Sequence, residues 1–191
     1  AERNAEGLER SEETNAQGFR VRRWLARDLV RPPLESASPQ RCEFAPVVDV
    51  TTFESWDAFA KWWWHFIEKE FVTTPQMQAK VAELTANLAS ERDKVQAIAR
   101  FVGQEIRYNS WPFGTHGYQP FSAATIFERR FGDCKDKSIL LRQMLAEIGV
   151  EAYPVLIRAE YFRSEEPLAV AMVEHFNHCI AYLPPTPDRP G

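Results

Sequence analysis

The fold is decided by one stretch, Phe131-Gly132-Asp133-Cys134-Lys135-Asp136-Lys137, and by the apolar positions that follow it, Ile139, Leu140, Leu141, Met144, Leu145 and Ile148, up to Gly149. These apolar residues recur at the three- and four-residue steps of an amphipathic helix. Glycine commonly follows a helix end because it accepts a left-handed backbone, so Gly149 predicts the end of this helix. Asp133 is a typical N-cap with Asp136 near the third helical position, which places Cys134 in the first turn.

This predicted position of Cys134 suits a nucleophile. A helix N-terminus carries partial positive charge and unpaired N–H groups, and both stabilise a thiolate. Gly132 permits a tight turn and close approach by a substrate, and the Cys134 amide would face a developing oxyanion. The alternative is a cysteine that packs as a small hydrophobe. Four ionisable neighbours make a core position unusual: Asp133, Lys135, Asp136 and Lys137.

A nucleophilic thiol needs an imidazole within hydrogen-bond reach. The chain has four histidines: His65, His116, His175 and His178. His178 is predicted within a strand, where it shares a face with apolar residues, and such a histidine is by itself more often a core residue than a catalytic one. However, a cysteine at a helix start, then a strand, then a histidine in the next strand is the order of papain-like cores. This order selects His178 as the base for Cys134.

The run Arg130–Lys137, the leucines and glycine of the helix behind it, and Phe176-Asn177-His178 resemble the core of bacterial transglutaminase-like domains. The resemblance implies an α+β, papain-like fold, in which the cysteine-bearing helix packs on a small antiparallel sheet beside an N-terminal helical lobe. It implies acyl transfer by a Cys-His-Asp triad at amide or peptide carbonyls of a protein or peptide substrate, through a thioester. It implies neither a metal nor an organic cofactor, and it suggests a bacterial periplasm or cell envelope as the location.

Two parts of that family's site do not map simply onto this sequence. Only Asp188 follows His178, within Thr-Pro-Asp-Arg-Pro, which predicts a turn rather than a strand. We therefore expect the triad aspartate to lie beyond residue 191, which would leave this fragment with a large loss of rate. For the oxyanion donor, Gln119 has suitable chemistry; Trp111 and Tyr118 share its loop, and loop packing is the alternative for all three.

The chain is predicted to divide after residue 53. Residues 1–53 resemble the tail of a preceding β-rich domain followed by a linker, with residues 1–17 polar and frayed. Residues 54–191 form the predicted transglutaminase-like core, which comprises a helical lobe at 54–105 and a Cys/His core at 106–183. In the lobe, Ser55, Thr74-Pro75 and Ser90 each stand where a helix is expected to begin.

Composition excludes several other classes. The net charge of −4 argues against nucleic acid, and no window of 18 apolar residues predicts a membrane span. Cys42, Cys134 and Cys179 lack the paired spacing of zinc or redox sites, and Asp133, Cys134 and Asp136 are too close in sequence for a known ligand set.

Two rival functions remain open at this point, and the sequence does not indicate an oligomeric state. A cysteine peptidase or amidase would use the same residues, because water and amines compete for one thioester. A non-catalytic binding module could instead dock partners on the tryptophan-rich helix, although Trp62–Trp64 fit the core of the helical lobe better.

Overall fold

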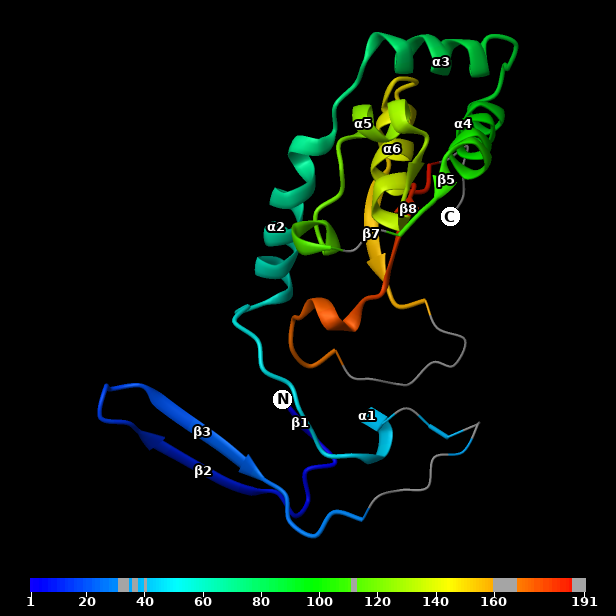
Figure 1. Ribbon diagram of the computed structural model, residues 1–191. Helices are drawn as coiled ribbons and strands as arrows, with labels where there is room; N and C mark the ends of the chain where they lie inside the picture. Colours follow the sequence, from blue (N-terminus) through cyan, green and yellow to red (C-terminus); the bar gives the residue numbers. More distant parts are fainter. Residues whose placement is uncertain (31–34, 36–37, 40, 111–112, 160–167, 187–191) are drawn as a thin grey trace. The chain divides into compact units, whose positions relative to one another are not determined.

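The computed structural model describes residues 1–30, 35, 38–39, 41–110, 113–159 and 168–186 (Figure 1). Contacts divide these residues into two compact units, one drawn from 1–56 and 160–172 and the other from 57–159 and 173–191. The expected division after residue 53, into a β-rich tail and a core, stays a prediction. No helix in the described part of the chain has the length and apolar character needed to cross a bilayer.

The first unit is built from short strands. β2 (Glu9–Thr14) and β3 (Arg20–Leu25) form an antiparallel hairpin, and β1 (Glu2–Arg3) pairs with β4 (Val47–Val48). A single helical turn, α1 (Arg41–Phe44), precedes β4.

The prediction that residues 1–17 are frayed is wrong, because Glu9–Thr14 is a strand. Every residue of β2 is exposed, so the strand has no buried face and lacks the apolar alternation that identifies strands in a sequence. Opposite charges on the two strands pair instead, Glu12 with Arg22 at 2.7 Å and Glu13 with Arg23, and Arg27, just after β3, pairs with Glu9 at 2.8 Å.

The second unit is a mixed helical and strand structure. Its helices are α2 (Trp56–Ile67), α3 (Pro75–Thr85), α4 (Glu91–Glu105), α5 (Ala123–Arg129) and α6 (Cys134–Ala146), with 3₁₀ turns at Glu68–Glu70, Gly114–Gly117 and Val173–His175. β5 (Arg107–Tyr108) pairs in parallel with β6 (Phe131–Gly132), and β7 (Tyr153–Ile157) pairs antiparallel with β8 (His178–Tyr182). The predicted α+β class is confirmed.

The helices of the second unit begin where their capping residues predict. The side chains of Thr74, Ser90 and Ser122 each accept a hydrogen bond from the backbone N–H three residues later, which satisfies one of the unpaired amides of the first turn. Pro75 at the first position of α3 needs no such partner. Helix α4 continues past Gly103 and ends at Glu105.

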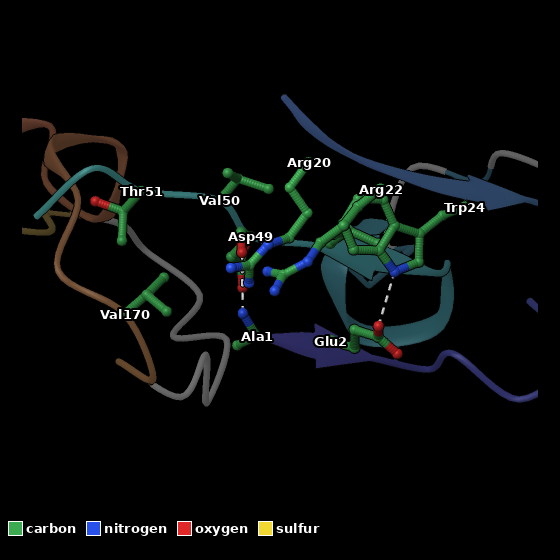
Figure 2. Close-up of a pocket in the computed structure, with 10 residues that line it drawn as sticks. Ala1, Glu2, Arg20, Arg22, Trp24, Asp49, Val50, Thr51 and Val170 are labelled. Carbon is green, nitrogen blue, oxygen red and sulfur yellow. Dashed lines mark hydrogen bonds between the residues drawn. The ribbon is translucent and has the colours of Figure 1, made fainter. Parts of the chain in front are cut away.

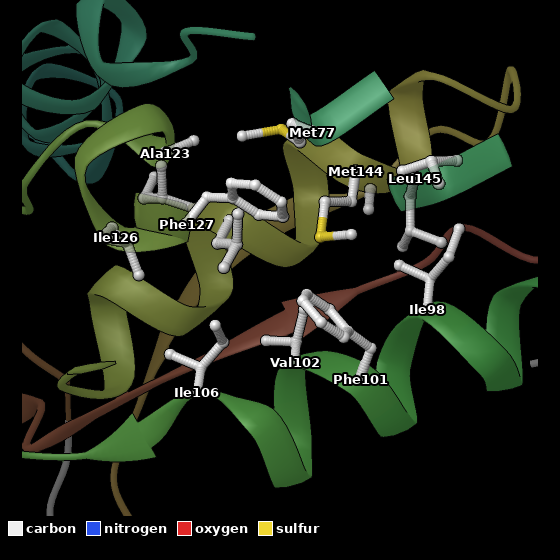
Figure 3. Packing of buried hydrophobic residues seen from close by; sticks show 14 of the residues in the cluster. Met77, Ile98, Phe101, Val102, Ile106, Ala123, Ile126, Phe127, Met144 and Leu145 are labelled. Atoms are coloured by element: carbon white, nitrogen blue, oxygen red, sulfur yellow. The ribbon is translucent and has the colours of Figure 1, made fainter. Parts of the chain in front are cut away.

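Helix α6 lies at the centre of the second unit and contacts β7 and β8 as well as α3, α4 and α5 (Figure 1). Its apolar side chains are buried with those of the surrounding helices (Figure 3), and the most buried are Ile67, Met77, Ile98, Ile106, Ile126, Ile139, Leu140, Met144 and Leu145. The cysteine-bearing helix therefore packs on a two-stranded antiparallel sheet, as predicted.

The tryptophan-rich helix α2 packs in this core as well. Trp63 is buried, and Trp62 and Trp64 are partly buried against the same cluster. The favoured interpretation, packing within the helical lobe, is confirmed, and α2 does not present these rings as an exposed docking surface.

Candidate active site

Cys134 is the first residue of α6, and a capping box fixes the helix start. The Asp133 carboxylate accepts a hydrogen bond from the Asp136 amide at 3.1 Å, and the Asp136 carboxylate accepts one from the Asp133 amide at 3.2 Å. Both predicted capping roles are confirmed. The thiol thus lies at the positive end of a 13-residue helix.

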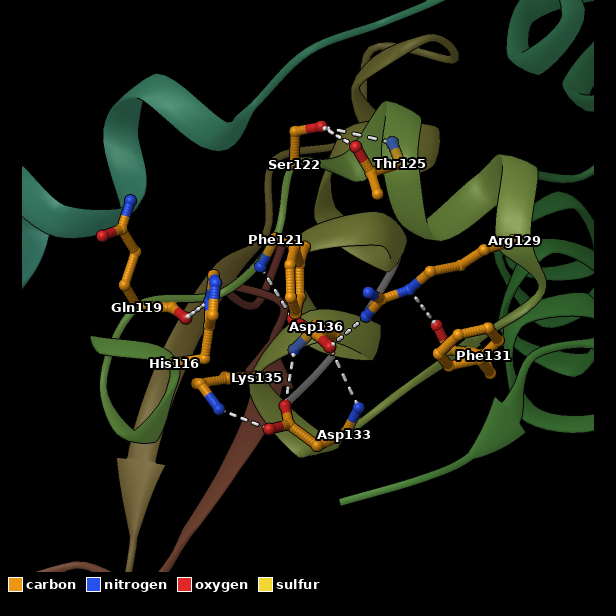
Figure 4. Close-up of polar contacts among 10 residues, drawn as sticks. All are labelled: His116, Gln119, Phe121, Ser122, Thr125, Arg129, Phe131, Asp133, Lys135 and Asp136. Atoms are coloured by element: carbon orange, nitrogen blue, oxygen red, sulfur yellow. Dashed lines mark hydrogen bonds and ion pairs between the residues drawn. The ribbon is translucent and has the colours of Figure 1, made fainter. Parts of the chain in front are cut away.

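The ionisable residues around Cys134 support the scaffold instead of facing solvent (Figure 4). Asp136 is only 3% exposed. Its carboxylate accepts hydrogen bonds from the Phe121 amide and the Arg129 guanidinium, each at 2.9 Å, so it ties α5 and the preceding loop to α6. The Arg129 guanidinium in turn lies 4.0 Å from the ring centroid of Phe121 and 4.5 Å from that of Phe131.

The two lysines of this run have similar roles. The Lys135 ammonium pairs with the Asp133 carboxylate, and both side chains are about nine-tenths buried. The Lys137 ammonium donates to the carbonyls of Gly103 and Ile106 at 3.1 and 2.8 Å, which satisfies acceptors at the C-terminal end of α4. Burial raises the pKa of Asp136 and lowers the pKa of Lys137. Although its charged neighbours are largely buried, Cys134 itself is only partly buried and is not a core residue, as expected.

Gly132 is required by packing against Asp136. A Cβ added at Gly132 would lie 2.6 Å from the Asp136 Cβ and 2.9 Å from its Oδ2. The space beside Gly132 is thus filled by the protein, so it does not provide the approach for a substrate that the sequence suggested.

We expect Gly132→Ala to lower the free energy of unfolding by about 1–3 kcal/mol, because this overlap forces Asp136 to move. Gly103→Ala is the matched control. Gly103 lies within α4 with open space at its Cβ position, so alanine should stabilise the protein by about 0.5–1 kcal/mol. Urea unfolding of both variants measures these changes, and a Gly132→Ala protein as stable as the wild type would contradict this packing role.

Cys134 and His178 line the same cavity, whose volume is about 260 Å³. His178 is the first residue of β8 and pairs with Ile157 of β7. The Ser138 hydroxyl lies within hydrogen-bond distance of the Cys134 carbonyl at 2.9 Å and of the Cys179 carbonyl at 3.2 Å, which links the start of α6 to β8. The structure thus brings together the two residues predicted as nucleophile and base.

Aromatic rings form much of the cavity wall: Trp63, Tyr118 and Phe176. Helix α2 supports these rings from behind. Phe59 stacks on Phe176 with centroids 5.9 Å apart, and the Trp62 ring meets Tyr118 edge-on at 6.4 Å. The helical lobe therefore shapes the surroundings of the thiol.

The remaining predicted site residues are placed differently. The Gln119 side chain donates a hydrogen bond to the Glu70 carboxylate at 2.8 Å, and Gln119 is not among the residues that line the cavity. Tyr118 does line it, whereas Trp111 and Asp188 lie outside the described residues. Within the described part of the chain, no hydrogen bond reaches the His178 imidazole from another side chain.

Tyr108 is a site residue that the sequence did not predict. It pairs with Gly132 across the parallel β5–β6 ladder, and Gly132 lies two residues before Cys134, so Cys134 is one of the groups that act on the pKa of its phenol. Partial burial raises the pKa of the Tyr108 phenol, and the neighbouring Cys134 and Asp133 raise it further. The hydroxyl consequently stays protonated at neutral pH and can donate a hydrogen bond.

Cys179 lies beside the site but is chemically distinct from Cys134. It is buried, and this burial raises the pKa of its thiol to about 12. Because the thiolate is the reactive form, burial and the raised pKa make Cys179 a poor nucleophile at neutral pH.

A larger cavity, of about 690 Å³, lies within the first unit (Figure 2). Its polar lining is largely committed to local pairs, since Arg22 binds Glu12 at 2.7 Å and the Trp24 indole donates to Glu2 at 2.7 Å. It contains neither a cysteine nor a histidine, so we do not assign it to the predicted chemistry.

Comparison with known proteins supports the same fold. A candidate protease from Parabacteroides distasonis has a similar structure, with a TM-score of 0.69 and 16% sequence identity over 93% of this chain. The match covers 34% of that protein, so this chain spans about a third of its length. A search of curated proteins gave no match. Residues 78–181 match the family model of the transglutaminase-like superfamily, and the chain therefore belongs to this superfamily.

Proposed function

We propose that the protein transfers acyl groups from amide or peptide carbonyls through a thioester on Cys134, with His178 as general base and acid. The observation that carries the proposal is the shared cavity of the two side chains, with the thiol at the N-terminus of α6. Membership of the superfamily supports the same chemistry.

In the first half-reaction, the Cys134 sulfur attacks the carbonyl carbon while the His178 imidazole takes the thiol proton. Collapse of the tetrahedral intermediate breaks the C–N bond, and His178 returns the proton to the leaving amine. The acyl group remains on Cys134 as a thioester. In the second half-reaction, His178 removes a proton from water or from an incoming amine, which attacks the thioester and restores the thiol.

The Cys134 amide and the Tyr108 hydroxyl are the proposed donors to the oxyanion of each tetrahedral intermediate. The amide belongs to the nucleophile itself, and Tyr108 lies across the β5–β6 ladder from Gly132, two residues before Cys134. Donors placed where negative charge develops stabilise the transition state more than the ground state. Tyr108 replaces Gln119 in this role, because the Gln119 amide binds Glu70.

We expect Tyr108→Phe to lower kcat for acyl transfer roughly hundredfold, because one oxyanion donor is lost while the ring is kept. Tyr182→Phe is the matched control, since Tyr182 lies at the far end of β8 from His178 and should show wild-type kinetics. Steady-state kinetics of both variants, with circular dichroism to confirm folding, make the comparison. A Tyr108→Phe enzyme with wild-type kcat would remove the tyrosine from the mechanism.

Hydrolysis by the same residues is the second candidate function. It is favoured by the similar structure, which is described as that of a candidate protease. Water and amines compete for one thioester, so the two functions differ only in the second half-reaction.

The test is a product assay with a glutamine-containing peptide library, in the presence and absence of a fluorescent primary amine. Transamidation predicts amine incorporated into peptide, detected by mass spectrometry, with an acyl-enzyme on Cys134 in quenched samples. Hydrolysis predicts free acid or cleaved peptide whether or not the amine is present. If no acyl-enzyme and no product form, the proposed function is wrong.

A further inference from the structure

The cavity beside Cys134 contains one carboxylate without a partner. Glu174, on the 3₁₀ turn Val173–His175, lines this cavity and is exposed. Among the residues that the structure describes, none forms an ion pair or hydrogen bond with its side chain. An exposed carboxylate that supports no local structure is available to a ligand.

The other charge on the cavity wall is neutralised by its own partner. Lys135 lines the cavity, but its ammonium is paired with the Asp133 carboxylate, and the two side chains are 10% and 8% exposed. A buried ion pair of this kind presents little net charge. Apart from the proposed catalytic pair, Glu174 is therefore the charged residue of this cavity lining that has no opposite charge beside it.

The remaining walls of the cavity suit both the methylene groups and the cationic group of a lysine or arginine side chain. Trp63, Tyr118 and Phe176 present aromatic rings, and cations bind favourably to the faces of such rings. Leu156 and Val173 add aliphatic surface, against which the methylene groups of lysine or arginine pack. The volume of about 260 Å³ is below the usual range for small-molecule pockets, roughly 300–1,000 Å³, and suits one side chain.

We propose that this cavity is a specificity subsite for a lysine or arginine side chain of a peptide acyl donor, and that Glu174 recognises its positive charge. The inference rests on the proposed function and deepens it, because it names the substrate class: peptides with a basic residue close to the attacked carbonyl. Charge recognition by Glu174 separates this subsite from a purely apolar one.

The test uses peptides that are identical except at single positions flanking the attacked carbonyl, where lysine, norleucine or glutamate is placed. Norleucine keeps the apolar stem of lysine without the ammonium group. The wild-type protein should show a kcat/KM roughly tenfold higher for lysine than for norleucine at one of these positions. Glu174→Gln should remove this preference, and Glu174→Lys should shift it to glutamate.

Glu128→Lys is the matched control, because Glu128 is exposed on α5 and does not line the cavity. This variant should keep the wild-type preference for lysine. If the wild-type protein forms an acyl-enzyme but treats lysine and norleucine alike, or if Glu174→Lys keeps the wild-type preference, the subsite is not one for a basic side chain and the proposed function still stands. If no peptide in the series acylates Cys134, the proposed function fails and this inference fails with it.

Discussion

Replacement of Cys134 by alanine is expected to lower acyl transfer by at least about a thousandfold, because no other group in the cavity can form the thioester. Cys179 lines the same cavity, but its thiol is buried and its pKa is raised to about 12, so it cannot substitute as a nucleophile. His178 has no thiol proton to accept in this variant. The product assay with peptide and primary amine measures the loss.

Two further variants test whether the loss of activity is due specifically to the Cys134 thiol. Cys134→Ser keeps a hydroxyl of similar size and should also be inactive, because serine is a much weaker nucleophile without further activation. Cys42→Ala removes a thiol from the first unit and should leave the rate unchanged. Equal activity of the Cys134→Ala and wild-type proteins would show that the reaction occurs elsewhere.

Replacement of Asp136 by alanine should lower the free energy of unfolding by about 3–5 kcal/mol, the usual cost of removing one partner from a buried ion pair. The Asp136 carboxylate pairs with Arg129, whose side chain is only 20% exposed. It also accepts hydrogen bonds from the amides of Phe121 and Asp133. Alanine leaves two amides without an acceptor and a partly buried guanidinium without its carboxylate. Chemical unfolding monitored by tryptophan fluorescence gives the value.

Asp136→Asn should cost less than Asp136→Ala, because asparagine keeps one carbonyl acceptor and removes a charge that is unfavourable to bury, as the raised pKa of Asp136 indicates. Asp57→Ala provides the control for loss of a carboxylate at an exposed pair. Asp57 and Lys61 are 73% and 76% exposed, so this change should cost less than about 1 kcal/mol. Similar losses for Asp136→Ala and Asp57→Ala would show that the buried network contributes little.

The features that depend on neighbours in the sequence could be predicted. The capping residues Thr74, Ser90 and Asp133 act within three residues of their own position, so their sequence context is sufficient to place the helix starts. The order of Cys134, strand and His178 was likewise enough to predict a shared site, since the resemblance supplied the fold.

The features that depend on distant partners could not be predicted. Asp136 binds Phe121, and Lys137 binds the carbonyl of Ile106, across sequence separations of 15 and 31 residues. Tyr108 reaches Cys134 only because β5 pairs in parallel with β6, and each of these strands has two residues, too few for a pattern. Strand β2 of the first unit was missed because all of its residues are exposed, so its sequence shows no apolar alternation.

The most direct measurement of the central claim is the rate of iodoacetamide labelling at each cysteine of the native chain, resolved by mass spectrometry, with and without His178→Ala. A thiol activated by His178 should be labelled first at Cys134, with Cys179 labelled only after unfolding. The His178→Ala change should slow Cys134 roughly tenfold or more, in a protein whose circular dichroism is unaltered. If Cys134 is labelled at the same rate in both proteins, or no faster than an unfolded thiol, the cavity does not contain a working nucleophile and base.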